Sequence, residues 1–408
     1  MHNQIKDTTY KTALILIFTL ALFIRVFYVL TIATGPLISD AATYDTLAIK
    51  LLEGPPFFDA AYDSRRAPLY PLFLALWYYG AGHHYLIIKL AQALLSSLLV
   101  FIMYSLAQLF FNKRTALFSA AIVAVYPIFL YYSGVLLSET LFLFLLTFSV
   151  LLIGKGALKN ASLPFWIGAL LLGLATLTRP VSALLVVVIS IWLFQLDITV
   201  SQKVRRTGML CILFAAIITP WMMRNYRVHK SFVFITTEAG YQIFASNNPL
   251  ANGAGVWQPG VYERFTKEYG TIVKQHPQEV DRQKYLFKEG LRFIKNNPKR
   301  YLWLMGDKFM WFWNAFPHTM FRDKIVSGLS YGILLPFFIL GFFQTLFKRD
   351  RKLLLFHFIV LYFTFIHCTF SYGSLRFRLP IEPYIIILAA HVILNFVERM
   401  KGKKPESV

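Results

Sequence analysis

The stretch SDAATYDTLAIKLLEG, residues 39–54, stands directly after a long apolar run, and a second polar piece, DSRRAPLYP, follows at residues 63–71. Both belong to a polar segment with several prolines that covers residues 35–84. Because only 15% of the residues are charged, charges gathered at one membrane surface indicate a specific use. Asp40 and Asp45 in the first piece and the arginine pair Arg65-Arg66 in the second therefore predict chemistry at the membrane surface.

The composition of the whole chain places this segment in an integral membrane protein. Of 408 residues 57% are hydrophobic and only 15% are charged, a balance that would make a soluble protein aggregate. The first apolar run contains Arg25 and no convincing cleavage site, so we interpret it as a retained anchor. The two cysteines, Cys211 and Cys368, both lie in apolar segments and offer neither a disulfide framework nor a metal-ligand spacing.

The net charge of +21 indicates how the chain is oriented in the membrane and does not indicate an anionic ligand such as nucleic acid. Lys and Arg gather in short blocks between apolar runs, as cytoplasmic loops do under the positive-inside rule, and nucleic-acid binding is not expected. The blocks are Lys6 and Lys11; Lys113 and Arg114; Lys155 and Lys159; Lys203, Arg205 and Arg206; Lys348, Arg349, Arg351 and Lys352; and Arg399, Lys401, Lys403 and Lys404.

Apolar runs of roughly twenty residues predict an all-α polytopic membrane protein with about ten transmembrane helices. The predicted spans are 12–33, 85–110, 115–136, 138–154, 162–178, 181–198, 207–222, 325–347, 353–373 and 379–397. With the basic blocks inside, both termini are cytoplasmic, and residues 35–84 and about 223–322 face the periplasm or the cell exterior. We therefore divide the chain into an N-terminal catalytic module, 1–222, an outer subdomain, 223–322, and C-terminal spans with a basic tail, 323–408.

The two outer segments are expected to differ. In the first, residues 40–52 predict a helix with Ser39 as N-cap and Gly54 as stop, lying on the membrane surface through an apolar face. Asp45 falls off that face and is expected to be solvated. In the second, the turn-rich stretch up to residue 260 has strand-like character, whereas residues 278–315 predict amphipathic helices.

Several spaced motifs resemble the GT-C superfamily of polyprenyl-phosphate-sugar-dependent glycosyltransferases, in particular the protein mannosyltransferase and lipid A aminoarabinose transferase branch (glycosyltransferase family 39-like). The matching pieces are Asp40-Ala-Ala-Thr-Tyr44; Arg66-Ala-Pro-Leu-Tyr-Pro71; Tyr126-Pro127 with Ser138-Glu139; Leu177-Thr-Arg-Pro180; Thr219-Pro-Trp221 with Arg224-Asn225; and Arg376-Phe-Arg-Leu-Pro380. They cover nearly the whole chain. One departure is that Asp40 is followed by Ala41, where many relatives carry a second acid.

The resemblance implies an inverting transfer of a sugar from a polyprenyl-phosphate donor to an acceptor hydroxyl at the outer face of the cytoplasmic (inner) membrane. Asp40 would be the general base, although an acid that begins a helix is also explained by the macrodipole. Glu139 would be a second acid that positions the acceptor, holds a divalent metal or pairs with an arginine, and a structural salt bridge is the alternative. No cofactor is certain, and a metal would depend on these two acids alone.

A departing lipid phosphate needs cations, and arginine meets phosphate oxygens with two parallel hydrogen bonds. The expected substrate-binding residues are Tyr44, Arg66, Tyr70, Lys89, Arg179, Arg224, Arg376 and Arg378. Interfacial arginines are usually anchors, so only some should touch the donor, and one of Arg376 and Arg378 is expected to face lipid headgroups. Arg25, deep in the first span, is expected to make a structural pairing. The histidines, among them His83, lack a carboxylate at useful spacing.

The acceptor, which could be a glycan, a lipid or a protein, and the sugar stay open. A polytopic transporter or lipid flippase is the alternative class, but transporters place ionisable residues near the midplane in two matching halves, and this chain has no internal repeat. A third reading is a polymerase or ligase that uses a lipid-linked oligosaccharide donor.

Overall fold

A computed structural model of the chain describes residues 2–35, 37, 39–54, 64–258, 260–316 and 325–402, with side chains from residue 8 onward. The side chain of Lys6, the basic residues Lys403 and Lys404, and the middle of the first polar segment lie outside the described residues. Within the described ranges the molecule is helical and contains no β-strand, only an isolated bridge between Asn252 and Gly255. The predicted all-α polytopic fold is confirmed.

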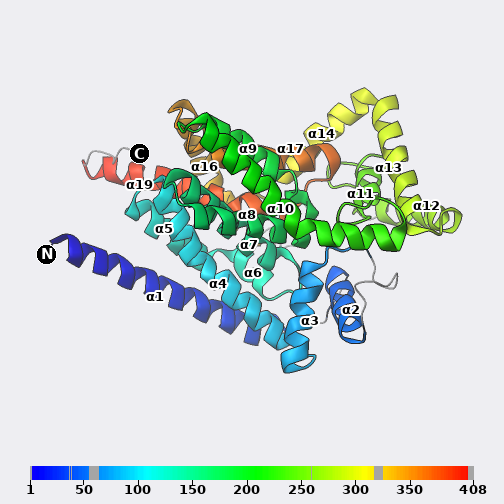
Figure 1. Ribbon diagram of the computed structural model, residues 1–408, viewed down its shortest axis with the longest axis horizontal. Coiled ribbons are helices and arrows are strands. Elements are labelled where there is room, and N and C mark those ends of the chain that lie inside the picture. The colour runs from blue at the N-terminus through cyan, green and yellow to red at the C-terminus, as the bar shows by residue number, and fades with distance from the viewer. Residues whose placement is uncertain are drawn as a thin grey trace.

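The apolar helices form an elongated bundle (Figure 1). Those long enough to cross a membrane are α1 (His2–Thr31), α4 (Tyr85–Phe110), α7 (Glu139–Leu158), α10 (Val200–His229), α16 (Ile333–Phe347, continuing a span that begins at Ile325) and α19 (Glu382–Met400, within a span from Leu375). Each of the ten predicted spans coincides with an apolar helix, but six of the described helices reach span length, so the number ten stays a prediction.

The remaining apolar helices are shorter or bent. They are α5 (Lys113–Val125), α6 (Pro127–Ser133), α8 (Ser162–Thr178), α9 (Leu185–Gln195) and α17 (Leu354–Phe370). Helices α5 and α6 are one predicted span broken by a 50° bend. Pro127, at the start of α6, has no N–H to continue the α5 ladder, which accounts for the break.

Arg25 supports this break from the neighbouring helix α1. It is fully buried, and its guanidinium donates to the carbonyl oxygens of Ala124 at 2.7 Å and Val123 at 2.9 Å, and to Ser96 Oγ at 2.8 Å. Inside a bilayer the carbonyls freed by the bend have no water to accept from. The expected structural pairing of Arg25 is therefore present, with backbone carbonyls in place of an acid.

Helix α19 occupies the centre of the bundle. Its residues from Tyr384 to Ala390 are all fully buried, as expected of a helix that is apolar on every side. Helices α7 and α8 pack closely because of small residues: a Cβ at Gly168 would lie 2.8 Å from the backbone nitrogen of Ile153.

The polar segments gather at one end of the bundle, and both chain termini lie at the opposite end (Figure 1). The helices of this outer end are α2 (Asp40–Leu52), α3 (Leu69–Ala81), α11 (Ala239–Ser246), α12 (Val261–Gln275), α13 (Glu279–Asn296) and α14 (Pro298–Trp313). A second, smaller apolar cluster lies here and is separate from the bundle core. Its buried members are Phe244, Ala245, Val256, Phe265, Ile272 and Leu286.

The strand-like character expected before residue 260 is wrong. The described residues there form loops and the short helix α11. Side chains of α10 take the place of a partner strand, because the carbonyl of Ile235 accepts from Trp221 Nε1 at 2.8 Å and Asn225 Nδ2 at 3.0 Å. The helices predicted within 278–315 are confirmed as α13 and α14.

Helix α2 has the predicted bounds, but Ser39 does not cap it through its side chain and several of its apolar residues are buried within the protein. Ser39 adopts a positive φ of 52° and its side chain makes no capping hydrogen bond. Tyr44, Leu47 and Ala48 are buried, and α2 packs against α3. The expectation of a solvated Asp45 is also wrong.

Asp45 lies at the junction of α2 with α3 and α4. It accepts hydrogen bonds from Tyr78 Oη at 2.7 Å and Tyr85 Oη at 3.1 Å, and it pairs with His83 Nε2 at 2.8 Å. His83 therefore does have a carboxylate partner, from a position 38 residues earlier in the chain, which local spacing could not reveal.

Candidate active site

Six charged side chains from distant parts of the chain meet at the outer end of the bundle. They are Asp40, Arg66, Glu139, Arg179, Glu238 and Arg376. Each lies at or beside a helix end, including the short helix α18 (Leu375–Arg378). Two of the acids are the first residues of α2 and α7, where the helix dipole favours a negative charge.

Asp40 is held by two arginines, one on each carboxylate oxygen. Arg66 Nη2 lies 2.5 Å from Oδ1, and Arg376 Nη1 lies 2.5 Å from Oδ2. Burial alone would raise the pKa of Asp40, but the positive charges of Arg376 and Arg66 outweigh it and lower that pKa. Asp40 is therefore a carboxylate at neutral pH, oriented by the two groups suited to bind a phosphate.

Glu139 continues the network beneath Asp40. Its Oε1 accepts from Arg376 Nε and, at 2.7 Å, from Arg179 Nη1. The side chain is fully buried, and its Oε2 has no hydrogen-bond partner among the described residues. Of the roles that the sequence left open, the structure shows pairing with arginines, since Arg376 links Glu139 directly to Asp40.

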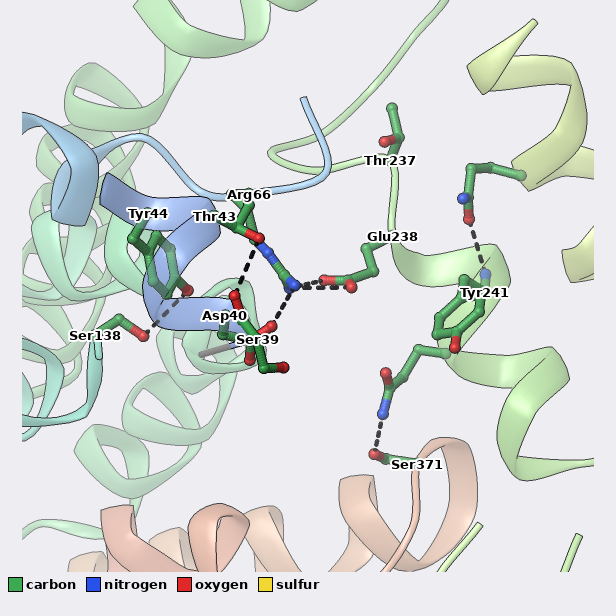
Figure 2. Close-up of polar contacts among 12 residues, drawn as sticks. Ser39, Asp40, Thr43, Tyr44, Arg66, Ser138, Thr237, Glu238, Tyr241 and Ser371 are labelled. Carbon is green, nitrogen blue, oxygen red and sulfur yellow. Dashed lines mark hydrogen bonds and ion pairs between the residues drawn. The ribbon is translucent and has the colours of Figure 1, made fainter. Parts of the chain in front are cut away.

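Glu238 ends the network on the side of the outer segment. Both of its oxygens accept from Arg66 Nη1, at 3.0 and 2.9 Å, so that Arg66 lies between Glu238 and Asp40 (Figure 2). Burial raises the pKa of Glu238 even though Arg66 opposes the shift. Sequence reasoning missed this residue. A signal existed, because Glu238 is the only acid between Asp197 and Glu263.

Five of these six groups, all except Glu139, line a cavity of about 850 Å³. Its inner wall carries Asp40, Arg66, Arg179 and Arg376, and its outer wall carries Glu238 and a group of aromatic side chains. Such a volume is typical of small-molecule sites. Arg65 also lines the cavity next to Arg66.

The two predicted tyrosines occupy different positions. Tyr44 lines the cavity and donates to Ser138 Oγ at 3.4 Å (Figure 2). Tyr70 packs edge-on against Tyr44 with ring centroids 4.9 Å apart, and its hydroxyl donates to Gln92 at 2.8 Å. Tyr70 is fully buried and is not among the cavity-lining residues, so it supports Tyr44 from behind.

The structure does not bring three of the predicted cations, Lys89, Arg224 and Arg378, to the cavity. Lys89 donates to the carbonyl of Ala33 at 2.5 Å, near the end of α1. Arg224 is buried in α10, donates to Ser64 Oγ at 2.6 Å and lies over the ring of Trp221. Neither residue is among those that line the cavity.

Arg378 faces neither the cavity nor lipid. It is fully buried and donates from Nε to Glu382 at 2.8 Å, while Tyr126 donates to the other oxygen of Glu382 at 2.5 Å. Its guanidinium also lies 3.6 Å from the ring centroid of Tyr331. The expectation of one site-facing and one lipid-facing arginine is therefore half right: Arg376 faces the site, and Arg378 is part of the bundle core.

Among the described residues, no group of three or more His, Cys, Asp or Glu side chains is placed to hold a metal ion. Asp40 and Glu139, the two acids on which a metal would depend, are bridged by the guanidinium of Arg376. This arrangement fits a site for an anionic group between arginines better than a site for a bound cation.

Comparison with known proteins supports the same family as the sequence motifs. Residues 65–223 match the model of the family described as dolichyl-phosphate-mannose-protein mannosyltransferase. No curated protein matches the chain in sequence.

Solved structures share the fold. The chain is similar to an oligosaccharyltransferase from Archaeoglobus fulgidus in the apo form, with a TM-score of 0.62 and 12% identity over 96% of this chain and 51% of that chain. It is also similar to ArnT from Cupriavidus metallidurans bound to undecaprenyl phosphate, with a TM-score of 0.56 and 14% identity over 95% of this chain and 61% of that chain. A third match is the archaeal oligosaccharyltransferase AglB from Archaeoglobus fulgidus, in complex with an inhibitory peptide and a dolichol-phosphate, with a TM-score of 0.60 and 13% identity over 99% of this chain and 53% of that chain.

The chain thus spans about half to three fifths of the length of these proteins. The family match over residues 65–223 agrees with the resemblance carried by the sequence motifs, and the solved structures show that the chain shares the fold of these glycosyl-transferring proteins.

Proposed function

We propose that this protein is an inverting glycosyltransferase, which takes a sugar from a polyprenyl-phosphate donor and transfers it to an acceptor hydroxyl at the outer face of the cytoplasmic membrane. The observation that carries the proposal is Asp40, held between Arg66 and Arg376 in the wall of the cavity. A proton acceptor beside two phosphate-binding groups is the pair of functions that this reaction needs.

The donor phosphate would bind where Asp40 now receives its hydrogen bonds. Guanidinium groups bind phosphate oxygens through paired hydrogen bonds, so the phosphate competes with Asp40 for Arg66 and Arg376. As the phosphate neutralises the two arginines, Asp40 loses the charges that lower its pKa and becomes a stronger base. Donor binding and activation of the base are thereby coupled.

The chemical step is then a single displacement. Asp40 accepts the proton of the acceptor hydroxyl as the acceptor oxygen forms a bond to C1 of the sugar. The bond from C1 to the phosphate oxygen breaks, its electron pair stays on the polyprenyl phosphate, and the arginines stabilise the developing charge. Attack from the face opposite the phosphate inverts the configuration at C1. The leaving lipid phosphate departs into the membrane.

The location agrees with this reaction. Helices α2 and α11, which carry cavity-lining residues, lie at the end of the bundle opposite both termini, in segments that the charge pattern predicts to be outside (Figure 1). Because nucleotide sugars are confined to the cytoplasm, a sugar donor at the outer face would be carried by a lipid. The two matched structures with a bound lipid phosphate support the same donor class.

Replacement of Asp40 tests the proposal. The Asp40→Asn variant, purified in nanodiscs, should release polyprenyl phosphate from a synthetic polyprenyl-phosphate sugar about 10²–10⁴-fold more slowly, as expected for loss of a general base. It should still bind undecaprenyl phosphate, since the arginines remain. Asp281→Asn, on an exposed position of α13, is the matched control and should behave as the unaltered protein.

Near-normal release by Asp40→Asn would refute the role of this residue. Monosaccharide and oligosaccharide donors are offered in separate reactions, which determines the size of the donor. Transport of an unmodified solute with no release of polyprenyl phosphate would instead identify a transporter or flippase.

A further inference from the structure

The outer wall of the cavity is built from aromatic side chains of segments that lie far apart in the sequence. They are Tyr241, Trp257, Tyr262, Tyr269 and Tyr372. None of them is charged, whereas the inner wall opposite is formed by the ion pairs of Asp40, Arg66 and Arg376. The cavity therefore has one wall suited to a phosphate and another suited to a neutral, partly apolar group.

The indole ring of Trp257 is partly exposed in this wall of the cavity. Its side chain is 43% exposed although it is the largest apolar group of the wall. Tyr262 stacks beside it with ring centroids 5.5 Å apart at 28°, and Tyr372 contacts it at 6.0 Å. A large ring held in place and left open to a cavity is costly unless it receives a ligand.

The loop that carries Trp257 is fixed by hydrogen bonds on both sides. Gly253 N donates to Asp307 at 2.5 Å, and the carbonyl of Gly253 accepts from Gly373 N at 2.8 Å. Gly255 has a positive φ of 72°, and a Cβ there would lie 3.2 Å from Tyr372. The aromatic face is thus positioned before any ligand arrives, which reduces the entropy lost on binding.

Hydrogen-bonding groups surround this face and are not used within the described part of the chain. The hydroxyls of Tyr241, Tyr262 and Tyr372 have no hydrogen-bond partner among the described residues. Gln283, which is 6% exposed and lines the cavity, holds the backbone N–H of Tyr241 with its Oε1 at 2.8 Å, while its Nε2 is without a partner there. Buried amide groups are normally satisfied, so this amide points to a ligand oxygen.

We infer that the acceptor is a carbohydrate, a neutral sugar ring whose C–H face lies on Trp257 and whose hydroxyls meet Gln283 and the tyrosines. The inference rests on the proposed function and names its acceptor class. A sugar ring has an apolar C–H face and a rim of hydroxyl groups. On this wall the ring of Trp257 suits the apolar face, and the amide and hydroxyl groups suit the rim. Glu238 lies between the aromatic wall and Asp40, at the position where the attacking hydroxyl would enter (Figure 2).

The other two acceptor classes fit less well. An extended peptide gains much of its affinity by pairing with a strand edge, and the described part of the outer segment offers no strand. A lipid chain would prefer a wall without the free hydroxyl and amide groups found here.

Replacement of Trp257 tests the inference. The protein in nanodiscs is given a synthetic polyprenyl-phosphate sugar, and the acceptors are a panel of neutral oligosaccharides, a random peptide library and a glycolipid set with the same glycans. We expect transfer to one or more glycans, free or lipid-borne. Trp257→Ala should raise the acceptor KM about tenfold, in line with the contribution of a stacked aromatic pair. Trp257→Phe should restore most of it, and kcat should change little.

Trp303→Ala is the matched control, because Trp303 is 55% exposed on α14 and does not line the cavity. Binding of undecaprenyl phosphate and slow hydrolysis of the donor are measured for every variant. If they persist while only peptides accept the sugar, or while the acceptor KM of Trp257→Ala is unchanged, the inference is refuted and the proposed function stands. If no variant binds the lipid phosphate or cleaves the donor, the proposed function itself fails. Should Trp257→Ala not fold, Tyr262→Ala serves in its place.

Discussion

At the scale of single residues, the site is a row of alternating charges in which two of the three arginines are each shared by two acids. Arg66 joins Glu238 to Asp40, and Arg376 joins Asp40 to Glu139. Sharing keeps these two guanidinium groups oriented toward the cavity before a substrate enters. Under the proposed function, an incoming donor phosphate would displace carboxylates from these arginines, and this competition would set the donor affinity.

Glu238 gives the most direct test of that competition. In Glu238→Gln one competing negative charge is removed from Arg66, so undecaprenyl phosphate should bind about two- to fivefold more tightly, the range expected for a partly exposed ion pair. The dissociation constant in nanodiscs is the measurement. Glu289→Gln, which removes an exposed pair with Arg292 on α13, is the control. Weaker binding in Glu238→Gln would show that Glu238 orients Arg66 for the phosphate more than it opposes the phosphate.

At the scale of elements, the broken helix α5–α6 is the feature that depends most on a distant side chain. The 50° bend at Pro127 removes the i+4 donors of the carbonyls of Val123 and Ala124, leaving Val123 only a long bond of 3.4 Å from Tyr126 N, and Arg25 of α1 donates to both carbonyls. One cation thus stabilises a kink through its donors and not through its charge. Helix α6 leads to Ser133 and the turn before Glu139, so the kink also sets the position of the site.

Removal of Arg25 should therefore destabilise the fold without touching the chemistry. Arg25→Leu leaves the buried carbonyl of Ala124 unsatisfied and that of Val123 with only the long bond from Tyr126 N. An unsatisfied buried carbonyl costs about 1–3 kcal/mol, so the variant should have a lower unfolding temperature in detergent and a lower yield of folded protein. Arg25→Lys, with fewer donors, should fall between. Turnover per folded molecule should stay close to that of the unaltered protein. Thr19→Ala, at an exposed position of α1, provides the comparison, and equal stability of the two variants would contradict the assigned role.

At the scale of the whole molecule, the chain separates a basic end from the end that carries the candidate site. Its termini lie at one end of the bundle, and helices α2 and α11, which carry cavity-lining residues, lie at the other (Figure 1). The positive-inside rule assigns the basic end to the cytoplasm.

Cysteine labelling on intact cells tests this orientation. In a parent with Cys211→Ala and Cys368→Ala, the variant Glu268→Cys on α12 should react with a membrane-impermeant maleimide from outside. The variant Lys203→Cys at the start of α10 should react only after permeabilisation. Both positions are on described helices of opposite ends, and Glu268 is exposed. The reverse pattern of labelling would place the cavity in the cytoplasm.

The parts of this molecule that the sequence predicts are those governed by local rules. Apolar runs fix the helices, because a bilayer leaves few alternatives for the backbone. Motifs identify Asp40, Arg66, Glu139, Arg179 and Arg376, and the structure brings these five residues together. Ion pairs between residues far apart in the sequence cannot be predicted from local motifs. Asp45 meets His83, and Arg378 meets a core glutamate, only because helix packing turns them inward.

The distance along the chain between the partners of Asp40 has a consequence for synthesis. Arg376 lies 336 residues after Asp40, and both bind the same carboxylate. No nascent chain that stops short of Arg376 can contain the complete cluster, however well its earlier helices are inserted. Unfinished copies therefore cannot assemble the proposed donor site and would not withdraw lipid carriers from the membrane, so the scarce carrier pool is left to molecules that have finished folding.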